Sequence, residues 1–309
     1  MTFTMHAAAP MNPDIRDKAT LDHADVRALN FIRADLPYRL RRHYRHGLRS
    51  HILEILDPAD VAREQAGILV DGVRCFPRAR PRRMFRIFRS RLGSLDSALK
   101  EIGRVKIVER YLAPDLMATS VEVIVDYQGP AGRDLILCGF QEYVDGVVID
   151  PWTLLDSGEL LTELYRQVAS RAVGAPLPEP AWIEALTQRA VEFGDRIRRM
   201  MTDARHIPDL AGAGNLMVTP RGGIRLVDIN NISPVTFGAR IDLDEKGYPV
   251  CDKSVEALAL IEEKLSGRPV DRNAPVYRHF FTPQRRRAVA EQEQRFWQAF
   301  SAGREPLSG

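Results

Sequence analysis

The chain has 309 residues, of which 45% are hydrophobic and 28% are charged, and its formal net charge is +3. This composition is typical of a globular protein and excludes disordered, collagen-like and disulfide-scaffold classes. The small net charge argues against a dedicated nucleic-acid-binding protein. The three cysteines are widely spaced and form no C-x-x-C pair, so no cysteine zinc site is predicted. Without a long apolar run or a secretory leader, the chain is predicted to be cytoplasmic and to lack a transmembrane segment.

The N-terminal part of the chain divides by pattern into three regions. Residues 1–24 are small, polar and interrupted by prolines, which predicts a disordered lead. Residues 25–65 repeat apolar side chains at helical spacing, with arginines on the polar side, which predicts a basic helical extension. Residues 66–145 are strand-rich: an Asp71-Gly72 turn and a Gly-Pro-Ala-Gly turn at 129–132 each separate two strand patterns.

One helix interrupts this strand-rich region, and longer helices follow it. The helix is expected over 94–112, with Ser94 as its N-cap. From residue 146 to 309 the pattern is mostly helical, with one short hairpin formed by LMV, the turn TPRGG and IRLVDI. The helices predicted here cover residues 154–173, 182–201, 252–265 and 284–300. The pattern therefore predicts an α+β protein with a strand-rich lobe and a helical lobe.

The hairpin of the helical region carries the clearest chemical signal. Asn215 directly precedes its first strand and Asp228 closely follows its second strand, so both should lie at the same end of the hairpin. Amide and carboxylate oxygens are ligands that Mg²⁺ accepts. Asp209, a few residues earlier, could take the proton of an attacking hydroxyl. The pattern predicts a magnesium site formed by Asn215 and Asp228, with Asp209 as a catalytic base.

This arrangement resembles the catalytic core of the protein-kinase-like superfamily, in which a D-x-x-x-x-N loop precedes a strand pair and a metal-binding Asp. The resemblance covers about residues 66–268 and implies a two-lobed fold that binds ATP and Mg²⁺. By the same resemblance, Asp209 corresponds to the catalytic-loop base, Asn215 to the second metal ligand and Asp228 to the Asp that opens the activation segment. Asn230 or Asn231 could supply a further oxygen ligand.

The resemblance extends to the strand-rich lobe. The segment GFQEYVDG, residues 139–146, is similar to the superfamily's hinge, which implies that Glu142, Tyr143 and Val144 contact the adenine. The helix over 94–112 corresponds to the helix of the N-terminal lobe and offers Glu101 or Glu109 as its ion-pairing carboxylate. Arg86 lies where the pattern calls for a lysine that contacts phosphate. Asp252 and Ser254 open a later helix whose leading Asp is implied to brace the catalytic loop.

The sequence also departs from the superfamily pattern. The loop from Asp209 to Asn215 is one residue longer than D-x-x-x-x-N, and no G-x-G-x-x-G occurs in the first strand pair. The stretch from Asp228 to Asp252 is short and carries no A-P-E-like sequence. This lean layout, with a reduced helical lobe, is more similar to kinases of small molecules or glycolipids. The expected acceptor is therefore a hydroxyl of a small molecule or a glycolipid.

Three alternative interpretations stay open. Without the strand lysine, the chain could be a pseudokinase that binds nucleotide or acts as an interaction module. LVDIN is similar to the acid-x-Asn strand of ATP-grasp ligases, although that fold uses a second metal carboxylate that the chain lacks at the expected spacing. The basic run over 74–91, with eight arginines and three phenylalanines, could bind nucleic acid or an anionic surface. A half-buried strand with a solvated face explains that run more simply.

Overall fold

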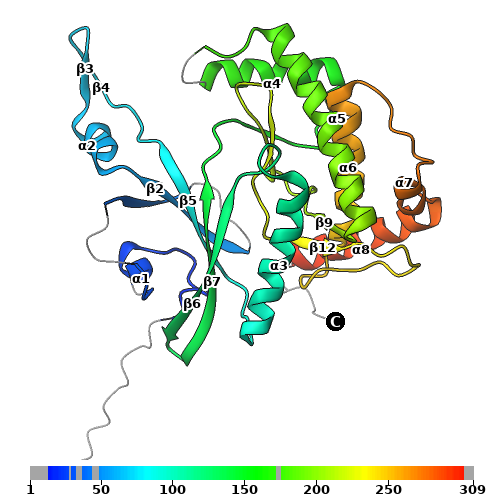
Figure 1. Cartoon of the computed structure of the whole chain (residues 1–309), viewed down its shortest axis with the longest axis horizontal. Coiled ribbons are helices and arrows are strands. Elements are labelled where there is room, and N and C mark those ends of the chain that lie inside the picture. Colours follow the sequence, from blue (N-terminus) through cyan, green and yellow to red (C-terminus); the bar gives the residue numbers. More distant parts are fainter. Residues whose placement is uncertain (1–12, 28, 33–36, 44–48, 172–174, 303–309) are drawn as a thin grey trace, which may run out of the picture. The chain divides into compact units, whose positions relative to one another are not determined.

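The computed structural model describes most of the chain, and its secondary structure is shown in Figure 1. The described residues are 13–27, 29–32, 37–43, 49–171 and 175–302. They belong to two compact units. The first unit takes Met1–Ile102 and Ser120–Tyr143, and the second takes Gly103–Thr119 and Val144–Gly309. Each unit has its own hydrophobic core.

A five-stranded antiparallel sheet organises the first unit, in the order β1-β2-β5-β7-β6. Its strands are β1 (Arg39–Arg42), β2 (Ser50–Leu56), β5 (Pro81–Phe88), β6 (Ser120–Gly129) and β7 (Gly132–Glu142). Strands β6 and β7 form the predicted hairpin, and Gly129 pairs with Gly132 at its turn. Because successive residues of a strand point to opposite faces, neighbouring apolar residues of β5 and β7 fill two different clusters.

Each face of this sheet has its own covering. On one face, Phe85 and Ile136 pack with residues of the N-terminal segment, which includes α1 (His23–Arg27). On the other face, Phe88 and Leu137 pack with Ala98 of α3 (Leu95–Leu112). Ser94 caps α3 as predicted, since its hydroxyl accepts the Ser97 N–H at 3.2 Å.

Two predictions for the N-terminal part are wrong. The helical extension over 25–65 contains β1 and β2, because pairing with β5 places the SHILEIL segment in the sheet. Its helical parts are α1 and α2 (Pro58–Ala66). In the predicted lead over 1–24, the described part is ordered: Ile15 is buried in the core, and Arg16 is buried beside Asp14 and Asp134. Residues 1–12 lie outside the described residues.

The strands around the Asp71-Gly72 turn form a separate two-stranded sheet, β3 (Ile68–Val70) and β4 (Val73–Cys75). Both turn residues have positive φ, 50° for Asp71 and 78° for Gly72, which suits a tight hairpin turn. The segment MFRIF, which follows this hairpin in the sequence, belongs to β5 of the larger sheet.

The second unit is mainly helical. It contains the C-terminal part of α3. Its other helices are α4 (Ser157–Arg171), α5 (Glu179–Asp203), α6 (Val250–Ser266), α7 (Pro275–Phe280) and α8 (Pro283–Ser301). Its strands are β8 (Val147–Ile149), β9 (His206–Pro208), β10 (Leu216–Val218), β11 (Ile224–Leu226) and β12 (Ile232–Pro234). They form a three-stranded sheet, β11-β10-β8, and a two-stranded sheet, β12-β9. The predicted long helices and the LMV/IRLVDI hairpin are thus confirmed, and residues 172 and 173, the predicted end of the first of these helices, lie outside the described residues.

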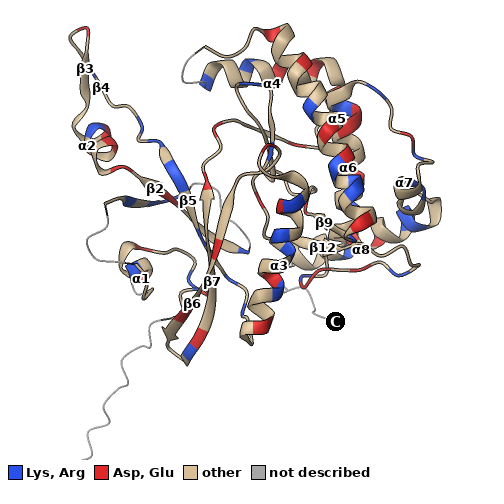
Figure 2. Cartoon of the chain, viewed as in Figure 1, with Lys and Arg blue, Asp and Glu red and all other residues tan. Residues whose placement is uncertain are grey.

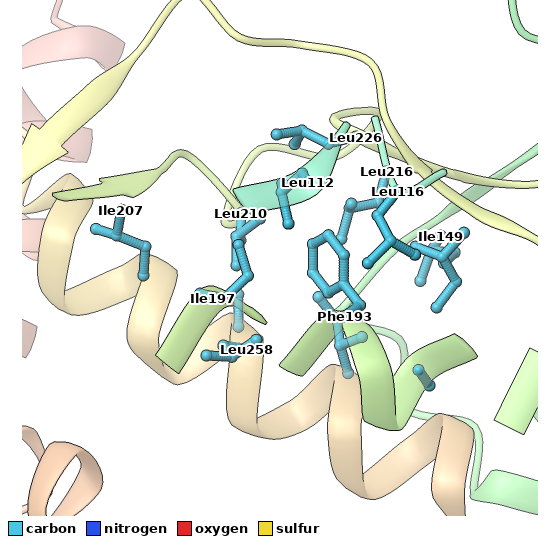
Figure 3. Packing of buried hydrophobic residues seen from close by; sticks show 14 of the residues in the cluster. Leu112, Leu116, Ile149, Phe193, Ile197, Ile207, Leu210, Leu216, Leu226 and Leu258 are labelled. Atoms are coloured by element: carbon cyan, nitrogen blue, oxygen red, sulfur yellow. The ribbon is translucent and has the colours of Figure 1, made fainter. Parts of the chain in front are cut away.

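The core of the second unit lies between its helices and short strands. Phe193 and Ile197 of α5 and Leu258 of α6 are fully buried, and Leu216 and Leu226 of the β10–β11 hairpin pack into the same cluster (Figure 3). The chain is therefore of mixed α+β class, with an antiparallel sheet in one unit and a helical core in the other. Among the described residues, no helix has the length and apolar character needed to cross a membrane.

Candidate functional site

The loop from Asp209 to Asn215 begins where two distant strands pair. Strand β9 pairs with β12, so that Pro208 faces Ile232. The Asp209 N–H continues this pairing by donating to the Asn231 carbonyl at 2.8 Å. The pairing therefore brings the start of the loop beside the segment that follows Asp228.

The Asp209 carboxylate is held by three nitrogen donors. One oxygen accepts the N–H groups of Ala211 at 3.0 Å and Gly212 at 3.2 Å. The other accepts the side-chain amide of Asn231 at 3.3 Å. Burial, reinforced by the negative charge of Asp228, raises the pKa of Asp209, although these donors oppose the rise. The side chain is fixed in one orientation, and its proton affinity is increased.

The structure places Asn215 and Asp228 at the same end of the β10–β11 hairpin, as predicted. Leu216 pairs with Leu226, and the Val227 N–H donates to the Asn215 carbonyl at 2.8 Å. The Asn215 side chain is buried, and its amide nitrogen donates to the Asp209 carbonyl at 2.8 Å. One carboxylate oxygen of Asp228 accepts the Asn230 N–H at 3.0 Å. Asp209, Asn215 and Asp228 therefore form one cluster.

The cluster offers oxygen atoms to a cation. The hydrogen bond from the Asn215 amide nitrogen leaves its carbonyl oxygen as the acceptor of that side chain, and Asp228 contributes a carboxylate. This donor set fits Mg²⁺, which takes oxygen ligands and keeps several waters. Within the part of the chain that the structure describes, no three His, Cys, Asp or Glu side chains gather in a way that could hold a metal ion. A cation here would therefore need amide oxygens, water or a bound phosphate in addition.

The loop from Asp209 to Asn215 is attached to the helical core through Leu210. Leu210 is fully buried in the same cluster as Ile197 of α5 and Leu258 of α6 (Figure 3). Its N–H donates to the hydroxyl of Ser254, on α6, at 3.1 Å. Asp252 does not make this contact, contrary to the expectation that the leading Asp braces the loop. It instead forms a bidentate ion pair with Arg285 of α8, with distances of 2.5 and 3.0 Å.

A polar and aromatic group adjoins the loop and was missed in the sequence. The Trp152 indole N–H donates to the Ala211 carbonyl at 2.8 Å, and the Lys253 ammonium lies 4.3 Å from the Trp152 ring centre. Lys253 also pairs with Glu256 at 2.7 Å and Glu293 at 3.0 Å. No spacing rule signals this group, because it unites a loop and two helices that are far apart in sequence.

The remaining predicted site residues lie around the first unit. Arg86 is buried on the face of the sheet that carries α3, 3.4 Å from the Ser120 hydroxyl and 4.0 Å from the Glu122 carboxylate. Glu101 is half-buried on α3. Glu142 ends β7 and Tyr143 ends the unit, whereas Val144 begins the second unit. The structure therefore unites Asp209, Asn215 and Asp228, and it places Arg86, Glu101, Glu142 and Tyr143 in the other unit.

The chain was compared with known proteins. No protein-family model matches it, and no curated protein matches it either.

Proposed function

We propose that the chain is an ATP- and Mg²⁺-dependent phosphotransferase with a two-lobed, kinase-like fold, and that it acts on a hydroxyl of a small molecule or glycolipid. The observation that carries the proposal is the cluster of Asp209, Asn215 and Asp228, with an oriented carboxylate beside two oxygen ligands. Phosphoryl transfer requires mainly positioning and neutralisation of phosphate charge, which such a cluster supplies.

Asn215 and Asp228 would hold the metal. A bound Mg²⁺ would neutralise negative charge on the phosphates of ATP. The hydrogen bond between the Asn215 amide and the Asp209 carbonyl fixes the amide, so that its oxygen is oriented before a ligand arrives. The short β10–β11 hairpin holds the two ligand residues at one end, with Leu216 and Leu226 anchored in the core.

Asp209 would act on the acceptor hydroxyl. A general base is most effective when its pKa lies closer to the working pH than that of a free carboxyl, and burial raises the pKa of Asp209 in this direction. The nitrogen donors of Ala211, Gly212 and Asn231 hold the Asp209 carboxylate in a fixed orientation. The acceptor hydroxyl would transfer its proton to Asp209 as its oxygen bonds to the terminal phosphorus of ATP. The bond between that phosphorus and the bridging oxygen would break at the same time, and ADP would leave.

The segment after β7 would bind the adenine. Glu142 is the last residue of β7, and Tyr143 and Val144 follow it before β8 begins at Val147. Main-chain groups of such a segment can bond the edge of a base, as the resemblance to the superfamily implies. Arg86, on the sheet, would contact phosphate in place of the usual lysine. Glu101, on α3, would be the ion-pairing carboxylate of that helix.

A second candidate function is nucleotide binding without turnover. The position of Arg86 favours it, because this side chain is buried beside Ser120 and Glu122. An arginine held by a buried carboxylate has less freedom to reach a phosphate. The same cluster of Asn215 and Asp228 would then bind MgATP, and the chain would act through its surface.

Thermal unfolding with and without MgATP tests nucleotide binding. A ligand at a hundred times its dissociation constant stabilises the folded state by about 2.7 kcal/mol. We expect this stabilisation in the native chain and its loss in Asp228→Asn, because the variant keeps the bond to the Asn230 N–H and loses the negative charge. Asp203→Asn, an exposed carboxylate at the end of α5, is the matched control and should respond as the native chain does.

Transfer of the terminal phosphate of radiolabelled ATP to polyols, aminoalcohols and glycolipids separates the two candidates. Transfer that is lost in both Asp209→Asn and Asp228→Asn supports the phosphotransferase. A MgATP-dependent stabilisation that requires Asp228, without transfer to any acceptor, supports the nucleotide-binding module. Stabilisation that persists unchanged in Asp228→Asn contradicts both.

A further inference from the structure

The two-stranded sheet β3–β4 carries apolar side chains that are exposed. All six residues of the two strands are exposed. Leu69, Val73 and Phe76 expose 67%, 63% and 62% of their surface. Large apolar side chains that gather on an exposed surface mark a binding site. We refer to residues 68–76 as the apolar hairpin; it lies beyond the larger sheet of its own unit in Figure 1.

The strand register shows how the side chains of the apolar hairpin are distributed. Ile68 pairs with Cys75 and Val70 pairs with Val73, so these four residues share one face. Leu69 and Arg74 are paired on the opposite face. One face of the hairpin is thus entirely apolar, and the opposite face carries one apolar side chain, Leu69, beside one arginine, Arg74. Among the described residues, the two strands of the hairpin pair only with each other, so the larger sheet of this unit does not extend over them.

Positive charge follows the apolar hairpin along the chain. The exposed arginines between residues 67 and 83 are Arg74, Arg78, Arg80, Arg82 and Arg83. Asp71 is the only acidic residue in that stretch. The acidic residues of the neighbouring helix α2 are engaged: Asp60 lies 3.2 Å from Arg63 and Glu64 lies 2.8 Å from Arg41. Of the five arginines, Arg82 lies 2.5 Å from Asp57, the N-cap of α2, and Arg78 lies 3.8 Å from Glu54. Figure 2 shows the hairpin mostly uncharged and the start of β5 blue with arginine.

We propose that the apolar hairpin docks the protein on an anionic lipid bilayer. Its aliphatic side chains would enter the interface between headgroups and acyl chains, and the arginines that follow would contact lipid phosphates. An apolar surface beside arginines is the combination that binds such interfaces. The proposal concerns a surface of the first unit and does not depend on the proposed phosphotransferase activity.

Two other occupants fit the observations less well. Single-stranded nucleic acid is bound by several aromatic side chains that stack on successive bases, whereas the apolar hairpin carries one aromatic residue, Phe76, and is otherwise mainly aliphatic. A second copy of the chain, related by a twofold axis, would set the same arginines against each other. An anionic bilayer accommodates both the aliphatic residues and the arginines.

Cys75 provides a direct probe of this docking. It is exposed, whereas Cys138 and Cys251 are buried, so a thiol-reactive fluorophore whose emission depends on polarity should label Cys75 selectively. The labelled chain would be mixed with vesicles of phosphatidylcholine alone and with vesicles that also contain about 30% phosphatidylglycerol, because anionic headgroups attract basic segments. We expect a blue shift and co-sedimentation with the anionic vesicles only, and both should weaken as salt is raised.

Paired variants locate the binding surface. In unlabelled protein, Leu69→Ser with Val73→Ser should reduce co-sedimentation at least tenfold, and it should leave thermal unfolding unchanged because both side chains are exposed. The matched control is Val191→Ser with Leu243→Ser, two exposed apolar residues of the second unit, which should bind as the native chain does. Equal binding by the hairpin variant and the native chain overturns the proposal. So does a blue shift with an RNA oligonucleotide, or a concentration-dependent dimer, in the absence of any response to anionic vesicles.

Discussion

Gly146 lies near the start of the second unit and packs closely against the three-stranded sheet of the same unit. A Cβ atom at this position would lie 2.3 Å from the main-chain oxygen of Val218, in β10. Main-chain atoms of a paired strand cannot move aside cheaply, so Gly146→Ala must displace the β8–β10 pairing. We expect a loss of about 1–3 kcal/mol in the free energy of unfolding, the usual cost of an overpacked site.

Urea unfolding followed by tryptophan fluorescence measures this change, because the tryptophans lie in the second unit and Trp182 is buried in its core. Gly103→Ala is the control: Gly103 lies inside α3, and a Cβ there meets nothing within 4 Å. Alanine in a helix is favoured over glycine by about 1 kcal/mol, so this variant should be slightly more stable. Equal stability of Gly146→Ala and the native chain would contradict the close approach.

Gly212 controls the orientation of a proposed metal ligand. A Cβ at Gly212 would lie 2.6 Å from the Asn215 amide nitrogen, which donates to the Asp209 carbonyl. Gly212→Ala should therefore break that hydrogen bond, at a cost of about 1 kcal/mol. We expect the free energy of unfolding to fall by about this amount. Because the Asn215 oxygen also loses its fixed orientation, we expect roughly fivefold weaker binding of MgATP, measured by calorimetry. Gly238→Ala, where a Cβ meets open space, should bind as the native chain does.

At the residue scale, the sequence predicts those contacts that a short hairpin enforces. Asn215 and Asp228 meet because β10 and β11 are joined by a tight turn, so their proximity follows from local spacing. The brace of the loop was assigned to the wrong residue of α6. Asp252 and Ser254 both lie in the first turns of the helix, and only the packing of α8 decides that Asp252 meets Arg285 while Ser254 meets Leu210.

At the element scale, Arg285 attaches α8 to the rest of the second unit. Its guanidinium contacts both carboxylate oxygens of Asp252 and donates to the Gly238 carbonyl at 2.7 Å, and both charged side chains are buried. Removing one partner of a buried ion pair leaves an uncompensated charge, which costs about 3–5 kcal/mol. Arg285→Met should lower the free energy of unfolding by that amount in urea titrations.

Two further variants check the cause of this loss. Arg286→Met changes an exposed arginine on the same helix and should alter stability by less than about 0.5 kcal/mol. Combining Arg285→Met with Asp252→Asn removes the buried charge and should restore part of the lost stability. If Arg285→Met is as stable as Arg286→Met, the pair does not hold α8 in place.

The elements that the sequence predicts well are those with a strong local signal. The Ser94 cap, the turn between Gly129 and Gly132 and the helix α5 each depend on residues close in sequence. Strand β2 was predicted as helix because its apolar residues fit either period over so short a stretch. Pairing with β5, more than twenty residues later, decides its conformation, and no local rule contains that information.

At the scale of the whole molecule, each of the two units consists of two separate stretches of the sequence, whereas the sequence analysis predicted a single boundary between the lobes. Residues 103–119 belong with the helical unit although strands of the first unit lie on both sides of them. The predicted boundary at residues 145–146 lies close to the observed one between Tyr143 and Val144, where a strand pattern gives way to helices. The earlier crossing lies inside the continuous helix α3, where no change of composition signals it.

The titrating carboxyl groups of the two units differ in a way that acid should reveal. In the first unit, the hydrogen bond from Arg16 lowers the pKa of Asp14 to about 2, from an ordinary value near 4. Burial opposes the shift at Glu54, but bonds from His43 and Arg41 still lower the pKa of that group. In the second unit, burial raises the pKa of Glu262 despite its bonds to Arg198 and Tyr277.

A carboxyl group whose pKa is lower in the folded state stabilises the fold above its unfolded pKa, and this contribution disappears as the pH falls through the folded value. For Asp14 the window is about pH 4 to 2, and the shift corresponds to roughly 2 kcal/mol. A group with a raised pKa, such as Glu262, has the opposite sign, because protonation in acid relieves the cost of its buried charge. Glu192, whose pKa is lowered by Arg189 and Arg196 although burial opposes this, offsets part of that gain.

We therefore expect acid to weaken the first unit before the second. All three tryptophans, Trp152, Trp182 and Trp297, lie in the second unit, so their fluorescence follows that unit alone, whereas far-ultraviolet circular dichroism follows both. Between pH 5 and 3, the urea midpoint from circular dichroism should fall more than the midpoint from fluorescence. Asp14→Asn should be less stable at pH 5 and should show a smaller difference between the two probes at pH 3. Two midpoints that fall together, in the native chain and in Asp14→Asn alike, would show that the buried Asp14–Arg16 pair does not set the acid response of the first unit.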